Sequence, residues 1–136
     1  MLAGDGWSFP LEWGSKRQTC VAHSTPEAEL VSLAKGLREA ALPICHLLEQ
    51  VSCESVHIEA LEDNMNTIQI INKGRSPALR HLAKTHRVSL ALVHEVCSSP
   101  GVTLVHCPTD VQLADSFTKA LERVKFDAAL LQLSIF

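Results

Sequence analysis

The sequence predicts an α/β domain, because segments with the twofold periodicity of strands alternate with segments of helical periodicity. Apolar and polar side chains alternate over residues 7–13 and again over residues 55–61, which is typical of strands with one buried face. Between them, residues 26–50 place apolar side chains at helical spacing. With 136 residues, 46% of them hydrophobic, the chain is long enough for one domain with a core. We therefore expect a single domain over 1–136, with residues 1–6 as a non-native or disordered start.

The first half of the chain is expected to run from strands into one long helix. Pro10 indicates an edge or a bulge in the first strand, which continues over 16–22 and sends residues 19–21 into the core. The helix at 26–50 is capped by Thr25 or Ser24. Pro43 predicts a kink in it or two abutting helices, because proline lacks the N–H that bonds to the preceding turn.

The second half alternates strands and helices in the same way. Asp63 and Asn64 follow the strand at 55–61, and one of the two is expected to cap the short helix that Gly74 ends. The remaining elements are expected to be a helix at 78–98, a strand at 102–107, a helix at 111–121 and a C-terminal helix at 122–136.

Charge is distributed unevenly along the chain. The net charge is −3, yet residues 64–94 contain no acidic residue. Arg80, Lys84 and Arg87 recur there at helical spacing, which predicts a basic ridge; a solvated helix face is the alternative. A basic segment beside acidic clusters suits a polyanion with metal ions between the two.

The cysteines and the chain start indicate an intracellular location, cytoplasmic or nuclear. Five cysteines at irregular spacing predict free thiols in a reducing compartment. No signal peptide and no apolar run of membrane-spanning length is recognisable, so no membrane partner is expected. His81, His86, His94 and Cys97 do not have the spacing of a structural zinc site.

Three acids have similar settings, early in a helix or at a strand-to-helix junction. They are Glu29, Asp63 and Asp115. A sheet with helices layered on it can bring such carboxylates together, and oxygen ligands suit Mg²⁺ or Mn²⁺. Two such ions, about 3.5–4 Å apart, hold the attacking and leaving oxygens of a phosphodiester. The alternative is that each acid only favours a helix N-terminus, which would leave an interaction domain.

Five motifs occur in order along the chain. They are WGSKRQ at 13–18, STPEAEL at 24–30, EDN at 62–64, KTH at 84–86 and ADSFTKAL at 114–121. Together they resemble the ribonuclease H domain of Ty1/copia-type retrotransposon Pol polyproteins, over about residues 7–121.

The resemblance implies a ribonuclease H-like fold, a mixed five-stranded β-sheet flanked by helices in three layers. It implies metal-dependent cleavage of the RNA strand of RNA–DNA hybrids during reverse transcription, with two Mg²⁺ or Mn²⁺ ions. The reverse transcriptase portion of the same polyprotein is then a partner. By position, Glu29, Asp63 and Asp115 resemble three metal-binding, catalytic acids of the family. The candidates for phosphate contact are Lys16, Arg17, Lys73, Arg75, Arg80, Lys84 and Arg87.

One departure from the family concerns its first acid, which lies on a strand before the W-x-S-K-x-Q motif. This chain begins too late to contain it, and Asp5 stands in a glycine-rich context that does not match. We therefore expect a truncated domain without the first strand, whose open sheet edge can pair with a second copy. Two functions stay open, an active ribonuclease H and an inactive remnant that only binds nucleic acid or protein.

Overall fold

The structure, a computed structural model, describes residues 1–4, 7–12, 14, 18, 21–108 and 122–132. The chain divides into two compact units, of which unit 1 comprises Met1–Arg17 with Pro108–Phe136 and unit 2 comprises Gln18–Cys107. None of the helices in the described ranges is long and apolar enough to cross a bilayer.

Unit 1 contains a short hairpin and a helix. Strand β1 (Leu2–Gly4) pairs antiparallel with β2 (Trp7–Phe9), and helix α6 covers Arg123–Gln132. Residues 1–6 were expected to be a non-native or disordered start, but β1, which lies within them, is a strand because its backbone pairs with β2. The expected first strand is shorter than 7–13 and ends before Pro10, which has no N–H to donate. The helix expected at 111–121 lies outside the described residues.

The described part of residues 16–22 does not form the strand that was expected there. Gln18, Val21 and Ala22 are not in a strand, and Val21 is 85% exposed rather than part of the core. The described strands form only the pairs β1–β2 and β3–β4, so this segment has no ladder partner among them. Without a partner strand, an apolar residue such as Val21 has no sheet face on which to be buried.

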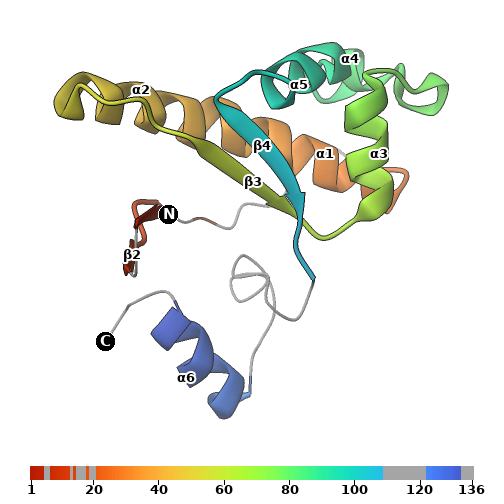
Figure 1. Cartoon of the computed structure of the whole chain (residues 1–136). Helices are drawn as coiled ribbons and strands as arrows, with labels where there is room; N and C mark the ends of the chain where they lie inside the picture. Colours follow the sequence, from red (N-terminus) through yellow and green to blue (C-terminus); the bar gives the residue numbers. More distant parts are fainter. Residues whose placement is uncertain (5–6, 13, 15–17, 19–20, 109–121, 133–136) are drawn as a thin grey trace. The chain divides into compact units, whose positions relative to one another are not determined.

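A long helical rod opens unit 2 and crosses behind the two strands of its sheet (Figure 1). It consists of α1 (Thr25–Gly36), the π-helical segment η1 (Leu37–Ala41) and α2 (Leu42–Ser52). Ser24 is its cap, since its Oγ accepts the Glu27 N–H at 3.3 Å. The interruption expected from Pro43 is confirmed as η1, which lies just before it. A wider turn, in which the Leu42 N–H bonds to the Leu37 carbonyl, accommodates the missing donor of Pro43.

The sheet of unit 2 has two parallel strands. Strand β3 (Ile58–Glu62) pairs with β4 (Val102–His106), with Ile58 opposite Val102 and Glu62 opposite His106. Side chains alternate along β3: Ala60 and Glu62 are buried, whereas Glu59 and Leu61 are exposed. The α/β class is confirmed, while the five-stranded, three-layered ribonuclease H sheet stays a prediction.

The prediction of one helix at 78–98 is wrong, because the helical structure is interrupted twice there. The structure has η2 (Pro77–Leu79), α4 (Leu82–Thr85) and α5 (Leu90–Cys97). Arg87 adopts φ 55°, which ends α4 and lets Val88 enter the core at 8% exposure. Ser89 then caps α5 by accepting the Leu92 N–H. The basic ridge predicted from Arg80, Lys84 and Arg87 therefore does not form on one helix.

The core of unit 2 joins the rod to the shorter helices. It is centred on Leu30, Leu37, Ile71, Leu79, Leu82, Val88 and Val93. Side chains on the buried face of the sheet, Ile58 and Leu104, pack against this cluster. The core thereby fixes the start of α1 beside helix α3 (Met65–Lys73), which follows β3. Cys45, Cys53 and Cys97, which the structure describes, are free thiols, as expected.

Gly74 is expected to resist replacement, because it ends α3 with φ 66° beside a histidine ring. A Cβ there would lie 2.8 Å from two ring carbons of His94, whose Nδ1 is 2.8 Å from the Ile71 carbonyl oxygen. We expect Gly74→Ala to lower the free energy of unfolding by at least about 1–2 kcal/mol, the cost of the left-handed backbone alone. Urea unfolding measures it.

Gly36→Ala is the matched control for Gly74→Ala. Gly36 is helical, and a Cβ there would meet no atom within 4 Å. Alanine favours a helix interior over glycine by about 1 kcal/mol, so this variant should be at least as stable as the parent. Equal effects of the two substitutions would contradict the role given to Gly74.

Candidate metal centre

Three carboxylates meet where the start of α1 approaches the end of β3. One oxygen each from Glu29, Glu62 and Asp63 lies within 4.8 Å of the others. Glu29 belongs to the first turns of α1, Glu62 ends β3, and Asp63 follows directly. The structure thus brings together two of the acids singled out from the sequence, Glu29 and Asp63. The third, Asp115, lies outside the described residues, as does Asp5.

A polar contact from α3 holds one of these acids, Glu29, in place, and Asn64 caps the same helix. Thr67, which is fully buried, donates from Oγ1 to Glu29 Oε2 at 2.8 Å. Asn64 caps α3, since its Oδ1 accepts the Asn66 N–H at 2.9 Å and the Thr67 N–H at 3.4 Å. Of the two residues considered for the cap, Asn64 therefore fills it, and the Asp63 carboxylate takes part in the acidic group instead.

Glu62 is the member of the group that sequence reasoning missed. Its side chain is only 6% exposed, and its Oε1 accepts the Asn64 N–H at 3.2 Å. Burial raises the pKa of the Glu62 carboxyl to about 7; the Asn64 N–H opposes this rise, and the charges of Glu29 and Asp63 add to it. The signal was present in the strand pattern, because Glu62 has the same parity as the buried Ala60.

The pKa of Glu62 predicts a pH dependence of stability. Between pH 4.5 and about 7 the folded chain holds a proton on Glu62 that the unfolded chain has lost, so stability falls as pH rises through this window. Glu62→Gln removes this contribution. Solvent screening reduces the effect of the pKa shift on stability. We therefore expect the free energy of unfolding of the variant, relative to that of the parent, to increase by about 1–2 kcal/mol from pH 5 to pH 8.

Urea unfolding of both proteins at pH 5 and pH 8, without divalent metal, measures this change. The difference between the two proteins cancels the titration of all other groups. An unchanged difference at the two pH values would show that the Glu62 carboxyl titrates normally in the folded state.

The donor set fits a hard divalent cation. All three donors are carboxylate oxygens, the ligands that Mg²⁺ and Mn²⁺ prefer, and no cysteine or histidine is in the described group. A cation there would offset the repulsion from Glu29 and Asp63, which adds to the effect of burial on the pKa of Glu62. His106 lies at the edge of this group, since its Nε2 is 3.1 Å from the Asp63 carbonyl oxygen.

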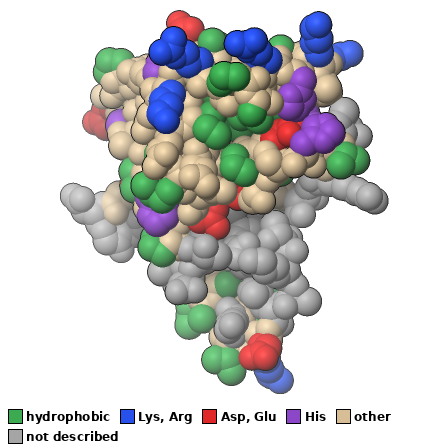
Figure 2. Space-filling view, turned by 90° about the vertical axis from the view of Figure 1, so that its right-hand side faces the viewer, with side chains coloured by type: hydrophobic (Ala, Val, Ile, Leu, Met, Phe, Trp, Pro, Cys, Tyr) green, Lys and Arg blue, Asp and Glu red, His purple; other side chains and the backbone are tan. Residues whose placement is uncertain are grey.

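A groove with basic walls lies in the same unit. It has a volume of about 720 Å³, and the cations that line it are Lys73, Arg75 and Arg80. Figure 2, which looks toward the side of α3 and α4, shows Lys and Arg side chains gathered along the top of that face. Lys84 and Arg87 are exposed but do not line the groove. Lys16 and Arg17 lie outside the described residues.

Comparison with known proteins supports the retrotransposon origin. The chain is similar to the Retrovirus-related Pol polyprotein from transposon RE2 of Arabidopsis thaliana, at 32% identity over 119 residues. It is also similar to the polyprotein from transposon RE1 of the same plant, at 30% identity over 119 residues. Each alignment covers 86% of this chain and 8% of the polyprotein.

No family model and no solved structure matches the chain. The chain spans a short segment of the curated relatives it matches, so their whole activity does not transfer to it. The similarity relates this chain to one segment of retrotransposon Pol polyproteins.

Proposed function

We propose that the chain is a copia-type ribonuclease H domain, which cleaves the RNA strand of RNA–DNA hybrids with Mg²⁺ or Mn²⁺. The observation that carries the proposal is the convergence of Glu29, Glu62 and Asp63 at the end of a parallel strand. Ligand sites of open α/β sheets lie at such carboxyl ends. The similarity to Pol polyproteins supports the setting, in which a reverse transcriptase is the partner and an RNA–DNA hybrid is its product.

The residues of this chain have distinct tasks in that reaction. Divalent ions held by these residues would supply an activated water and would stabilise the charge that develops on the phosphodiester. Glu29 and Asp63 would hold the metal; Asp115, the third acid predicted from the sequence, lies outside the described residues. Thr67 keeps Glu29 aimed at the group through its 2.8 Å hydrogen bond. Glu62 would release its proton as a cation binds, so metal affinity should rise with pH around neutrality.

The basic groove would hold the phosphate backbone of the hybrid. Lys73, Arg75 and Arg80 line it, and such contacts give affinity without reading sequence. Recognition of a hybrid would then follow its shape and its 2′-hydroxyl groups. This role keeps three of the cations singled out from the sequence, in a groove rather than on a helical ridge.

Removal of charge from the groove tests this part of the proposal. We expect the triple variant Lys73→Gln, Arg75→Gln, Arg80→Gln to bind hybrid about tenfold or more weakly, and to lower the slope of log K against log salt by about 1 per lost contact. Fluorescence anisotropy over a salt series measures both quantities. Arg38→Gln is the control, since Arg38 is an exposed cation that does not line the groove.

Cleavage of a labelled RNA–DNA hybrid in Mg²⁺ and in Mn²⁺ tests the activity itself. The expected result is endonucleolytic cuts in the RNA strand that Asp63→Asn abolishes. A folded chain that binds the hybrid but leaves it intact would favour the alternative, an inactive remnant that acts only as a binding module. Cleavage that survives in Asp63→Asn would show that the activity comes from elsewhere.

A further inference from the structure

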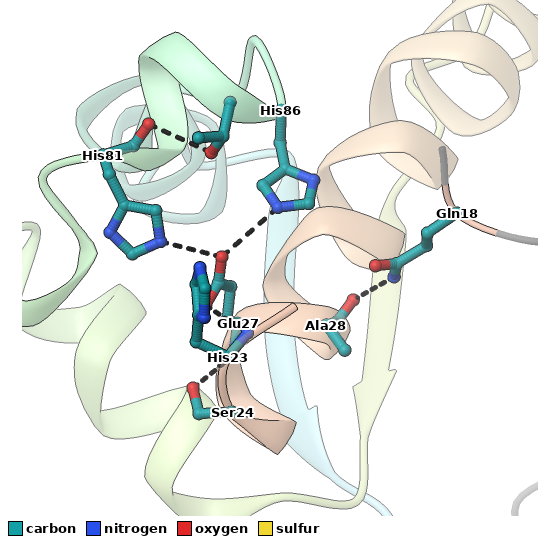
Figure 3. A network of polar contacts seen from close by, with 8 residues as sticks. Gln18, His23, Ser24, Glu27, Ala28, His81 and His86 are labelled. Carbon is teal, nitrogen blue, oxygen red and sulfur yellow. Dashed lines mark hydrogen bonds and ion pairs between the residues drawn. The ribbon is translucent and has the colours of Figure 1, made fainter. Parts of the chain in front are cut away.

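A second buried carboxylate, Glu27, lies in the first turn of α1, two residues before Glu29. It is 1% exposed, and the proposed mechanism does not use it. Figure 3 shows His81 and His86, from the segment around α4, pointing at one of its oxygens. The His81 Nε2 lies 2.8 Å from Glu27 Oε1, and the His86 Nε2 lies 3.2 Å from the same atom. We refer to Glu27, His81 and His86 as the Glu27 cluster.

The Glu27 cluster explains how a buried carboxylate stays ionised. Burial alone raises the pKa of the Glu27 carboxyl, but hydrogen bonds from the His23 N–H and the His81 ring hold it below its ordinary value. The His86 side chain is only 3% exposed, and its Nε2 makes no well-formed hydrogen bond. Its 3.2 Å contact with Glu27 is therefore the interaction that compensates its burial.

The two oxygens of Glu27 do different things. Oε2 accepts the His23 N–H at 2.9 Å, which closes the start of α1 together with the bond from the Glu27 N–H to Ser24. Oε1 reaches across to His81 and His86. The same carboxylate thus fixes the first turn of α1 and joins it to the segment around α4.

Glu29 leaves that turn in another direction, toward α3. Its Oε2 accepts from Thr67, and it meets Glu62 and Asp63. The first turn of α1 is therefore held by Glu27 against the segment around α4 and by Glu29 against α3. Arg80, which directly precedes His81 in the chain, lines the basic groove.

We infer that Glu27, His81 and His86 are positioning residues that hold Glu29 in the geometry for metal binding and link the carboxylate site to the basic groove. This inference rests on the proposed function, since it assigns the cluster a task in presenting Glu29 to a cation. A purely structural cluster is the alternative. It would stabilise the fold without any effect of metal on its histidines.

Ring signals of the histidines in the unmodified protein provide the first test. In nitrogen-detected NMR, Mg²⁺ is expected to shift the His106 ring, which contacts the Asp63 carbonyl, and also the His81 and His86 rings. His57 is the control that should not move, since it is exposed and its Nε2 contacts Thr103 at 2.7 Å. A shift of His106 without shifts of His81 and His86 overturns the inference and leaves the proposed function standing. No shift of any ring overturns both.

Matched substitutions provide the second test. Leucine removes the ring donor at His81 and His86, whereas glutamine keeps an N–H donor near the position of Nε2. We expect the double leucine variant to bind Mn²⁺ about tenfold more weakly, as for other residues that orient metal ligands, and the double glutamine variant to recover most of the affinity. Electron paramagnetic resonance of free Mn²⁺ measures the affinity, and urea unfolding measures the fold.

The structural alternative predicts a different pattern in these variants. If the leucine variant is less stable but binds Mn²⁺ as tightly as the parent, the inference is wrong. If the leucine variant does not fold, the glutamine variant and the NMR titration decide. A folded glutamine variant that binds no better than Glu29→Gln would also contradict the positioning role.

Discussion

Asp63→Asn is expected to weaken Mn²⁺ binding by about tenfold or more, and Glu29→Gln is expected to do the same. Each substitution removes one of three carboxylates that converge within 4.8 Å, and with it both a ligand and a negative charge. The nearby polar side chains of Thr67 and Asn64 cannot supply the lost ligand, because Thr67 already bonds to Glu29 and Asn64 already caps α3. Titration calorimetry, or the signal of free Mn²⁺, measures the affinity at pH 8, where Glu62 is ionised.

Glu59→Gln is the matched control for these variants. Glu59 is on the same strand as Glu62 and lies on its exposed face. Its substitution changes the net charge by the same amount as Glu29→Gln and Asp63→Asn. Long-range electrostatics alone would therefore affect all three variants alike, whereas a metal site would leave Glu59→Gln close to the parent. Equal Mn²⁺ affinity in all three variants would mean that the acids only serve the helix starts.

Ile71→Ala is expected to lower the free energy of unfolding by about 2–5 kcal/mol. The Ile71 side chain is fully buried at the centre of the core that joins α1, α3 and the short helices. Its loss leaves a cavity that close-packed neighbours cannot fill. For a domain whose total stability is about 5–15 kcal/mol, this is a large fraction, so the carboxylate group formed by α1 and the end of β3 should also loosen.

Urea unfolding with Met65→Ala as the control separates packing from helix propensity. Met65 lies in the same helix and is 49% exposed, so its truncation should cost far less than that of Ile71. Comparable losses in the two variants would show that α3 is not anchored through Ile71.

Local signals determined the elements whose ends depend on a few neighbouring residues. Helix α3 begins at Asn64, one of the two caps that the sequence left open, and ends at Gly74 as predicted, because a short polar side chain and a glycine suit those backbone positions. The interruption before Pro43 is of the same kind, since the missing donor is a property of one residue. The alternation of β3 likewise contained the clue to Glu62.

Packing between distant parts of the chain determined the elements that sequence periodicity predicted incorrectly. Residues 78–98 have helical spacing, yet Arg87 turns to φ 55° so that Val88 can join the core, and that gain exists only when α1 and α3 are already in place. The strand expected at 16–22 depends in the same way on a partner strand, and Gln18, Val21 and Ala22 have none among the described residues.

The candidate site also has features that local sequence signals predict and features that depend on tertiary contacts. The sequence by itself determined that Glu29 and Asp63 stand near a helix start and a strand end, because those positions follow from local caps and periodicity. Only the tertiary structure decided that Glu62 joins them and that Glu27 meets His81 and His86, 54 and 59 residues further along the chain. The physical reason is burial: whether a carboxylate is desolvated, and which donors then compensate it, depends on neighbours that folding brings from distant parts of the chain.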